Sequence, residues 1–261
     1  MASESDPQED GHSCQNFRKQ GYGDWEFEVY DPKMEINADF TRRVAVHAAT
    51  LEWKPSPTPG VERRMLDRIG GEVARATSIV RYASHSHFPR HTHGGGEEFL
   101  VLEGVFQDEH GDYPAGFYIR NPPTSAHTPG SEDGCTIFVK LWQFDLADRT
   151  SLRIDTSKLP YASDSSRPGV TVVPLFRDAH ETVALEHWSA DAEIPLRSPA
   201  GLELLVLDGS FTENEDRFGY QSWLRLPPGS AARARAGEKG CRVWVKTGHL
   251  THPPTAPAGV R

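Results

Sequence analysis

The sequence predicts an all-β protein built from two β barrels or sandwiches in tandem. Three observations support this prediction: an internal repeat, short runs of β-forming residues, and the lack of a convincing helical period in the core. The 23 Gly and 20 Pro residues suit many short strands and tight turns better than a helical bundle. At 261 residues, the chain can form two small domains that each have a core.

The internal repeat consists of three sequence blocks that return in the same order. FLVLEGVF (99–106) returns as LLVLDGSF (204–211), YIRNPPTSAH (118–127) as WLRLPPGSAA (223–232), and GCTIFVK (134–140) as GCRVWVK (240–246). The offset is 105 residues for the first two blocks and 106 for the third, which indicates one inserted residue. Because such agreement is hard to obtain by chance, we expect each copy to fold as one structural unit.

Each copy is a string of short runs that are rich in β-branched and aromatic residues. In the first copy these runs include EEFLVLEG, GFYIRN and TIFVKLWQF, separated by Gly, Pro, Asp and Asn. The most helix-like piece, residues 61–68, is short and its counterpart contains a proline, so we predict a strand or turn there. The predicted segments are a disordered tail (1–22), a first barrel (23–147), a linker (148–167), a second barrel (168–250) and a disordered tail (251–261).

Composition excludes several classes of function. The net charge of -9 repels phosphate backbones, so we expect no nucleic-acid partner. No apolar run approaches the roughly 18 residues that span a bilayer, and the acidic N-terminus resembles neither a secretory signal nor a transit peptide. We therefore expect a cytoplasmic protein without a membrane partner. The three cysteines form no disulfide framework, and Cys135 and Cys241 are expected to be buried strand residues.

One stretch, FPRHTHGGGEEFLVLEG (88–104), has the pattern of a metal site. Residues two apart on a strand share a face, so the imidazoles of His91 and His93 can converge. Three glycines then allow a tight turn, and Glu97 opens the next strand beside the two histidines. His127 follows thirty residues later, after an NPP turn. Three imidazoles and one carboxylate suit a first-row dication such as Fe(II), Mn(II), Ni(II), Cu(II) or Zn(II).

These motifs resemble the cupin superfamily. A first cupin motif, H-x-H, a spacer, E and then Gly, is matched by His91, His93, Glu97 and Gly104, and a second motif is matched by Pro114, Gly116 and His127. The sequence around these motifs is most similar to the ChrR-like group. The similarity is strong over residues 45–144, and residues 168–247 resemble a diverged copy. This group includes the cupin halves of zinc-binding anti-sigma factors and acetylacetone-dioxygenase-like proteins.

The resemblance implies two tandem double-stranded β-helix (cupin, jelly-roll) barrels, with His91, His93, Glu97 and His127 as ligands of one divalent metal ion. Fe(II) or Zn(II) is expected first, then Mn(II) or Ni(II). The leading expectation is an Fe(II)-type dioxygenase that acts on a small oxygenated compound such as a diketone or hydroxyketone. A non-catalytic zinc-binding regulator or sensor is the alternative, and a sugar- or acid-modifying isomerase is a third. Residues before the barrel include His12 and Cys14 but no helical zinc-binding anti-sigma domain, which argues against the regulator.

The second copy provides an internal control. At the offset of 105, the four ligands fall on Leu196, Ser198, Leu202 and Ala232, while the β framework survives. Scattered surface histidines would have no reason to disappear as a set. We therefore expect one active barrel and one structural or dimer-forming barrel, and a homodimer joined through edge strands.

Four further residues are candidates for binding the small-molecule substrate, namely Arg81, Tyr82, Phe99 and Tyr118. Arg81 falls on Glu186 at the constant offset and so changes together with the ligands, whereas Arg120 recurs as Arg225 and is expected to be structural. We expect Glu98 to face outward as a solvated or ion-paired residue. His85, His87 and His110 are expected on the surface. No residue is assigned as catalytic.

Overall fold

The computed structural model describes residues 34–251, so Cys14 and the predicted tails, apart from Thr251, lie outside the described residues. Within this range the chain consists of strands and turns, and its only helical elements are two 3-10 turns, η1 (Ala48–Thr50) and η2 (Thr156–Lys158). The all-β prediction is confirmed. No helix in residues 34–251 is long and apolar enough to cross a membrane.

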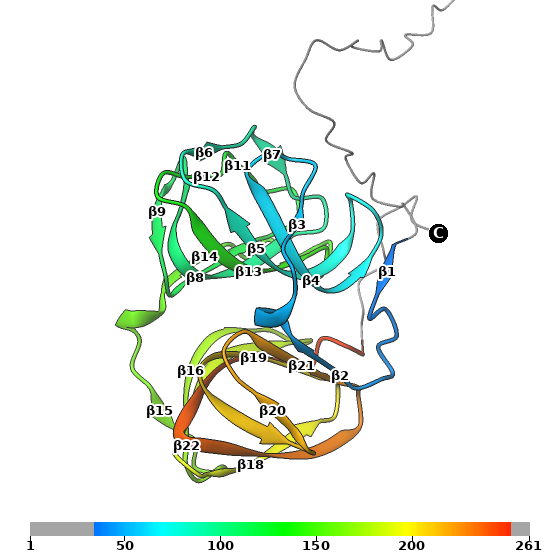
Figure 1. The fold of residues 1–261 in the computed structure, drawn as a ribbon, viewed down its shortest axis with the longest axis vertical. Helices are drawn as coiled ribbons and strands as arrows, with labels where there is room; N and C mark the ends of the chain where they lie inside the picture. Colours follow the sequence, from blue (N-terminus) through cyan, green and yellow to red (C-terminus); the bar gives the residue numbers. More distant parts are fainter. Residues whose placement is uncertain (1–33, 252–261) are drawn as a thin grey trace, which may run out of the picture.

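Two barrels lie one above the other, and each is built around an antiparallel sheet (Figure 1). Strands of the first barrel are β1 (Glu35–Ile36), β3 (Lys54–Pro55), β4 (Val61–Ile69), β5 (Arg75–Tyr82), β6 (Ser86–His87), β7 (His91–Thr92), β8 (Glu97–Asp108), β9 (Gly111–Pro114), β10 (Phe117–Asn121), β11 (Ala126–His127), β12 (Gly130–Ser131), β13 (Cys135–Leu141) and β14 (Leu152–Asp155). Strands of the second barrel are β2 (Val44–His47), β15 (Ala162–Ser163), β16 (Val170–Arg177), β17 (Thr182–Trp188), β18 (Glu193–Ser198), β19 (Leu202–Glu213), β20 (Asp216–Phe218), β21 (Ser222–Leu226) and β22 (Ser230–Thr247).

The sequence repeat is a structural repeat. The strand order β5-β13-β8-β10 of the first sheet returns as β17-β22-β19-β21 in the second. Residues 61–68 form most of β4, a strand, as expected. Cys135 and Cys241 are free and buried at equivalent places on β13 and β22, which confirms their expected role as strand residues.

Strand register corrects one correspondence between the copies. Arg81 pairs with Thr136 in the first barrel, and Arg242, the equivalent of Thr136, pairs with His187 in the second. Arg81 therefore corresponds to His187 and not to Glu186. The prediction was wrong because the first copy has one residue more between β5 and β7 than the second copy has between β17 and Leu196, so the offset is 106 along β17 and 105 after it.

The two barrels exchange strands. The segment before the first repeat contributes a strand to the second barrel, and the segment before the second repeat contributes a strand to the first barrel. The early strand β2 pairs with β21 of the second barrel, and β14 pairs with β10 of the first barrel. Strand β14 lies within the segment 148–167, so this segment completes the first sheet as well as connecting the barrels. Likewise, residues 44–47 lie in the predicted first barrel but belong to the second sheet.

Three apolar clusters form the core. One fills the first barrel, one fills the second, and one lies between them with residues from both. Alternation along β8 shows how the strands serve two cores, because Phe99 and Val101 point into the first barrel while Leu100 packs in the interface. A strand that is buried on both faces reads as a continuous apolar run, as FLVL does here.

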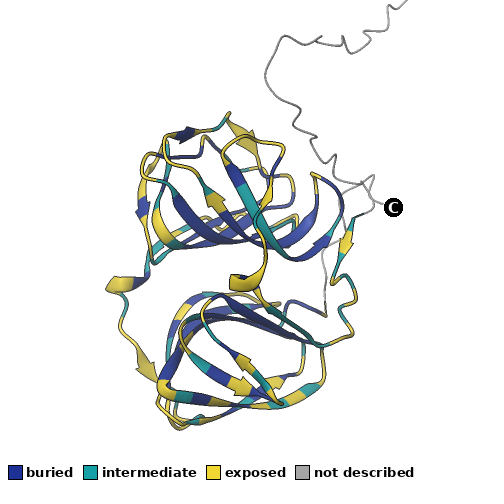
Figure 2. Cartoon of the chain, in the orientation of Figure 1, coloured by how far each residue is buried: buried dark blue, intermediate teal, exposed yellow. Residues whose placement is uncertain are grey.

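Buried ion pairs join the barrels in a reciprocal pattern. Glu98 of the first barrel pairs with Lys246 of the second, and Lys140 of the first pairs with Glu203 of the second at 2.5 Å. Arg120 adds an ion pair to Glu98 at 3.3 Å, in agreement with its expected structural role. Glu98 is thus ion-paired, but it is 1% exposed rather than solvated. Much of the chain that faces the opposite barrel is buried (Figure 2).

Candidate metal centre

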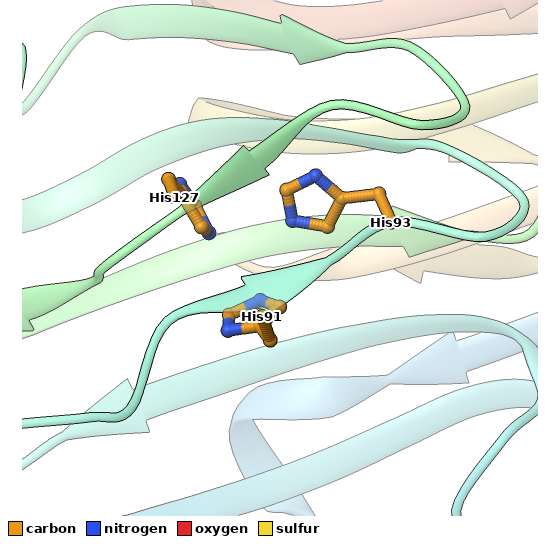
Figure 3. A group of neighbouring side chains, drawn as sticks. All are labelled: His91, His93 and His127. Atoms are coloured by element: carbon orange, nitrogen blue, oxygen red, sulfur yellow. The ribbon is translucent and has the colours of Figure 1, made fainter.

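The two short strands β7 and β11, and the turn that follows β7, bring the three predicted histidines together. His91 lies on β7 and His127 on β11, and the two residues are directly opposite each other in an antiparallel pair. His93 follows β7, and its ring faces the same space as the other two rings (Figure 3). The ring centroids lie 4.7–5.1 Å apart. One nitrogen from each ring lies within 4.8 Å of the others, so this group could hold a metal ion.

Glu97 completes the set at the first residue of β8. Its Oε2 lies 3.3 Å from Nε2 of His93 and 3.7 Å from Nε2 of His127. His93, Glu97 and His127 are buried, whereas His91 is exposed. The site is therefore set into the barrel wall with its open side at His91.

The three glycines between His93 and Glu97 are required by close packing. A Cβ on Gly95 would lie 2.3 Å from the ring of Trp142, and a Cβ on Gly96 would lie 2.4 Å from the ring of Phe144. Of the triplet, only Gly96 has a positive φ, at 76°. The glycines thus allow the turn, as expected, and they also let Trp142 approach the backbone.

The imidazoles are oriented by acceptors on their outer sides. Nδ1 of His93 lies 3.0 Å from Oγ of Ser125, and Nδ1 of His91 lies 3.3 Å from the Pro89 carbonyl oxygen. Ser125 donates its own hydroxyl proton to the Pro122 carbonyl oxygen, so it accepts from His93. These contacts place the proton on Nδ1 and leave the Nε2 lone pair facing the centre.

His127 lies beside a carboxylate without a hydrogen bond to it. Its Nδ1 lies 3.5 Å from Oδ2 of Asp108, which is itself held through Oδ1 by the Tyr113 hydroxyl and the His110 backbone N–H. On the inner side, Asn121 donates a hydrogen bond of 3.1 Å to Oε2 of Glu97. Sequence reasoning missed Asp108, Ser125 and Asn121 because the motif defines only the ligands. Only Asn121, a polar residue at the buried end of β10, gave a signal in the sequence, because Asp108 and Ser125 lie among other polar turn residues.

Electrostatics act differently on the members of the site, because burial opposes ionisation of His127 but Asp108 and Glu97 outweigh it and raise the pKa of His127. Burial lowers the pKa of His93. Burial opposes ionisation of Glu97, but the nearby imidazoles of His93 and His127 outweigh it and lower the pKa of Glu97. Among the described residues, Nε2 of His93 is buried without a hydrogen-bond partner. An orphaned lone pair beside a carboxylate and two further imidazoles fits a borderline dication.

The structure brings two of the four substrate-binding candidates into the barrel. Tyr82 and Phe99 both contact the ring of Phe106, which lies 5.8 Å from the ring of His127. Arg81 lies on the outer face, where it pairs with Glu62 and stacks on Trp53. Placing Arg81 in the pocket was wrong because the register puts alternate β5 residues, Val80 and Tyr82, on the inner face.

Tyr118 is likewise not part of the site. Its ring lies in the interface cluster, and its hydroxyl donates a hydrogen bond of 2.7 Å to Glu98. The prediction was wrong because both faces of β10 are buried, and Tyr118 shares a face with Arg120. His85, His87 and His110 are exposed, as expected.

Comparison with known proteins gives the family and the fold. The family model described as the ChrR Cupin-like domain matches twice, over residues 41–145 and 149–251. No match was found among curated proteins. A proposed dioxygenase from Nostoc punctiforme superposes with a TM-score of 0.67 at 15% identity, over 83% of this chain and 86% of that one.

Two metal- or ligand-containing structures share the same fold. The bacterial pirin of Escherichia coli in complex with nickel(II) has a TM-score of 0.55 at 14% identity, over 82% of this chain and 100% of that one. An oxalate decarboxylase of Lactobacillus farciminis in a formate complex has a TM-score of 0.56 at 10% identity, over 81% and 86%. At such identities these similarities show the fold alone.

Proposed function

Since this chain belongs to the ChrR cupin-like family, we propose that its first barrel is a mononuclear metal site that catalyses oxidation of a small oxygenated organic compound. The observation that carries the proposal is the convergence of three imidazoles, with Nδ1 of His91 and His93 held by acceptors on the outer side and Nδ1 of His127 3.5 Å from the Asp108 carboxylate. His91, His93, His127 and Glu97 would hold the ion. A bound dication would supply Lewis-acid polarisation and a template for substrate oxygens.

Residues around the centre suit a diketone or hydroxyketone. Phe99 and Phe106 provide an apolar wall that excludes water from the inner side of the site. Burial raises the pKa of Tyr82 above the ordinary range of a phenol, so this hydroxyl stays protonated and can donate to a substrate oxygen. Exposed His91 marks the side from which substrate enters. The fold neighbours named for dioxygenase and decarboxylase activity agree with this class of chemistry.

Metal content by elemental analysis is the first test. The wild-type protein should carry about one equivalent of iron, manganese or nickel, as expected for one four-residue site, and a His91→Ala/His93→Ala variant should lose it. The matched control is His85→Ala/His87→Ala, because these histidines have the same spacing but are exposed and lie beside Glu132. Retention of metal by the His91→Ala/His93→Ala variant would refute the site.

Oxygen uptake by the Fe(II)-loaded protein tests the reaction. We expect consumption of dioxygen with 2,4-pentanedione or a hydroxyketone, and none with the ligand variant. About one equivalent of tightly held zinc without oxygen uptake would instead support the regulatory alternative, since Glu97 and three histidines can complete a tetrahedron. Oxygen uptake that persists without metal would contradict the proposal.

A further inference from the structure

The second barrel contains a cavity where the first barrel has its histidines. This cavity of ≈580 Å³ is lined by Leu196 and Leu202, among others. Leu196 pairs with Ala232 as His91 pairs with His127, so the two sites are equivalent in register. The volume lies within the range of about 300–1,000 Å³ that is usual for small-molecule pockets.

Smaller side chains help to leave this space open. Leu202 pairs with Thr247 as Glu97 pairs with Leu141, so Thr247 takes the place of a larger leucine. Two positions after Leu202, Leu204 takes the place of Phe99. Both Thr247 and Leu204 line the cavity. At these positions the second barrel therefore has smaller side chains than the first, and leucine in place of metal-binding residues at 196 and 202.

The inner end of the cavity carries a buried polar group that is absent from the first barrel. Glu186, which is 4% exposed, corresponds to Val80 in the strand register. Arg167 donates two hydrogen bonds to its carboxylate, at 2.6 and 3.0 Å, and the Trp188 indole N–H donates a third at 2.8 Å. Arg167 also pairs with Asp164, so these three side chains together carry one negative charge, which the two guanidinium groups of Arg177 and Arg197 outweigh.

The charge available to a ligand is positive. Arg177 and Arg197 line the cavity from β16 and β18 and are exposed at its rim. Neither guanidinium has a hydrogen-bond or ion-pair partner within residues 34–251. The nearby carboxylates of Asp164 and Glu186 both form ion pairs with Arg167. Planar guanidinium groups bind carboxylates in bidentate geometry.

We propose that the second barrel is a binding site for a small organic carboxylate with an apolar body, independent of the metal centre. The apolar part of the ligand lies against Leu196, Leu202 and Leu204, and its carboxylate lies between Arg177 and Arg197. The two barrels thus have separate ligands, a metal in one and an organic anion in the other. This inference does not rest on the proposed oxidation.

Calorimetric titration with phenylacetate tests the proposal, and neutral, isosteric phenylacetamide serves as the comparison. The full chain with His91→Ala/His93→Ala should bind phenylacetate saturably, which separates this site from the first barrel. Phenylacetamide should bind at least about tenfold more weakly, because it cannot pair with the two guanidinium groups.

Variants locate the site. Arg177→Gln/Arg197→Gln should weaken phenylacetate binding at least about tenfold, whereas Arg217→Gln, an exposed arginine on β20 outside the cavity, should leave it unchanged. Leu204→Phe restores the residue type of the first barrel and should abolish binding by filling the space. No saturable binding up to millimolar phenylacetate, or binding unchanged by both the arginine and the filling variants, would overturn the proposal.

Discussion

The short distance between Asp108 and Nδ1 of His127 gives the sharpest test of the metal centre. In an Asp108→Asn variant, Oδ1 would still accept from the Tyr113 hydroxyl at 3.1 Å and from the His110 backbone N–H at 2.8 Å. The side chain should therefore keep its position. The amide nitrogen would then replace Oδ2 and face Nδ1 of His127, so two donors would oppose each other. His127 would move its proton to Nε2, which removes the lone pair that the metal needs.

The expected cost follows from the role of such outer contacts. Loss of a carboxylate that orients a ligating histidine typically weakens metal affinity about 10- to 100-fold, which corresponds to about 1.4–2.7 kcal/mol. The contact of 3.5 Å is longer than a strong hydrogen bond, so we expect the lower half of this range. Ser125→Ala should cost less than Asp108→Asn, because the hydroxyl oriented toward His93 is neutral.

Competition with a chromophoric chelator at neutral pH measures the affinity for Ni(II) or Zn(II). The control is Asp112→Asn, which removes a nearby carboxylate that accepts from Gln107 and forms no hydrogen bond or ion pair with a histidine within residues 34–251. Unchanged circular dichroism would establish that the fold persists. An Asp108→Asn affinity within about twofold of wild type, well short of the usual effect of such contacts, would refute the reasoning that Asp108 fixes the tautomer.

Three further outcomes test the packing and the charges around the site. Lys246→Met should lower the free energy of unfolding by about 3–5 kcal/mol, because it removes a positive charge that pairs with the buried carboxylate of Glu98. The double variant Glu98→Gln/Lys246→Met should lose less stability than the sum of the losses in the two single variants. Urea titrations measure the free energy of unfolding of all three variants. Burial opposes ionisation of Glu98, but Lys246 and Arg120 outweigh it and lower its pKa from 4.5 to about 2, so the stability that it contributes is full above pH 4.5 and is lost as the pH falls toward 2. Urea midpoints should therefore fall more steeply over this pH window in wild type than in Glu98→Gln. Gly95→Ala should disrupt the turn beside the metal, since its Cβ would lie 2.3 Å from the Trp142 ring, and should lower both metal content and thermal stability.

Each of these outcomes has a clear contradiction. A Lys246→Met protein as stable as wild type would show that the interface does not depend on this ion pair. Parallel acid profiles for wild type and Glu98→Gln would remove Glu98 from the acid response. A fully metallated Gly95→Ala protein of normal stability would mean that Trp142 can move aside without cost.

The sequence alone was sufficient for the repeat, the fold class and the three converging histidines. These features are local or periodic. Residues two apart on a strand share a face, and the same short strand sequences recur in both copies at a nearly constant offset. The joint loss of all ligand types from the second copy was also visible in the sequence. Burial of Cys135 and Cys241 followed from their apolar strand context.

Only the tertiary structure decided which partner each strand takes and which face it turns inward. The exchange of β2 and β14 between the barrels depends on pairing between residues far apart in the chain. Tyr118 and Glu98 lie on strands that are buried on both faces, so alternation could not tell a barrel interior from an interface between barrels. Likewise, the first copy has one residue more after β5 than the second copy has after β17, so the counterpart of Arg81 is His187 and not Glu186. Because a shift of one residue turns every side chain of a strand to the opposite face, register set by long-range pairing determined which residues reach the sites.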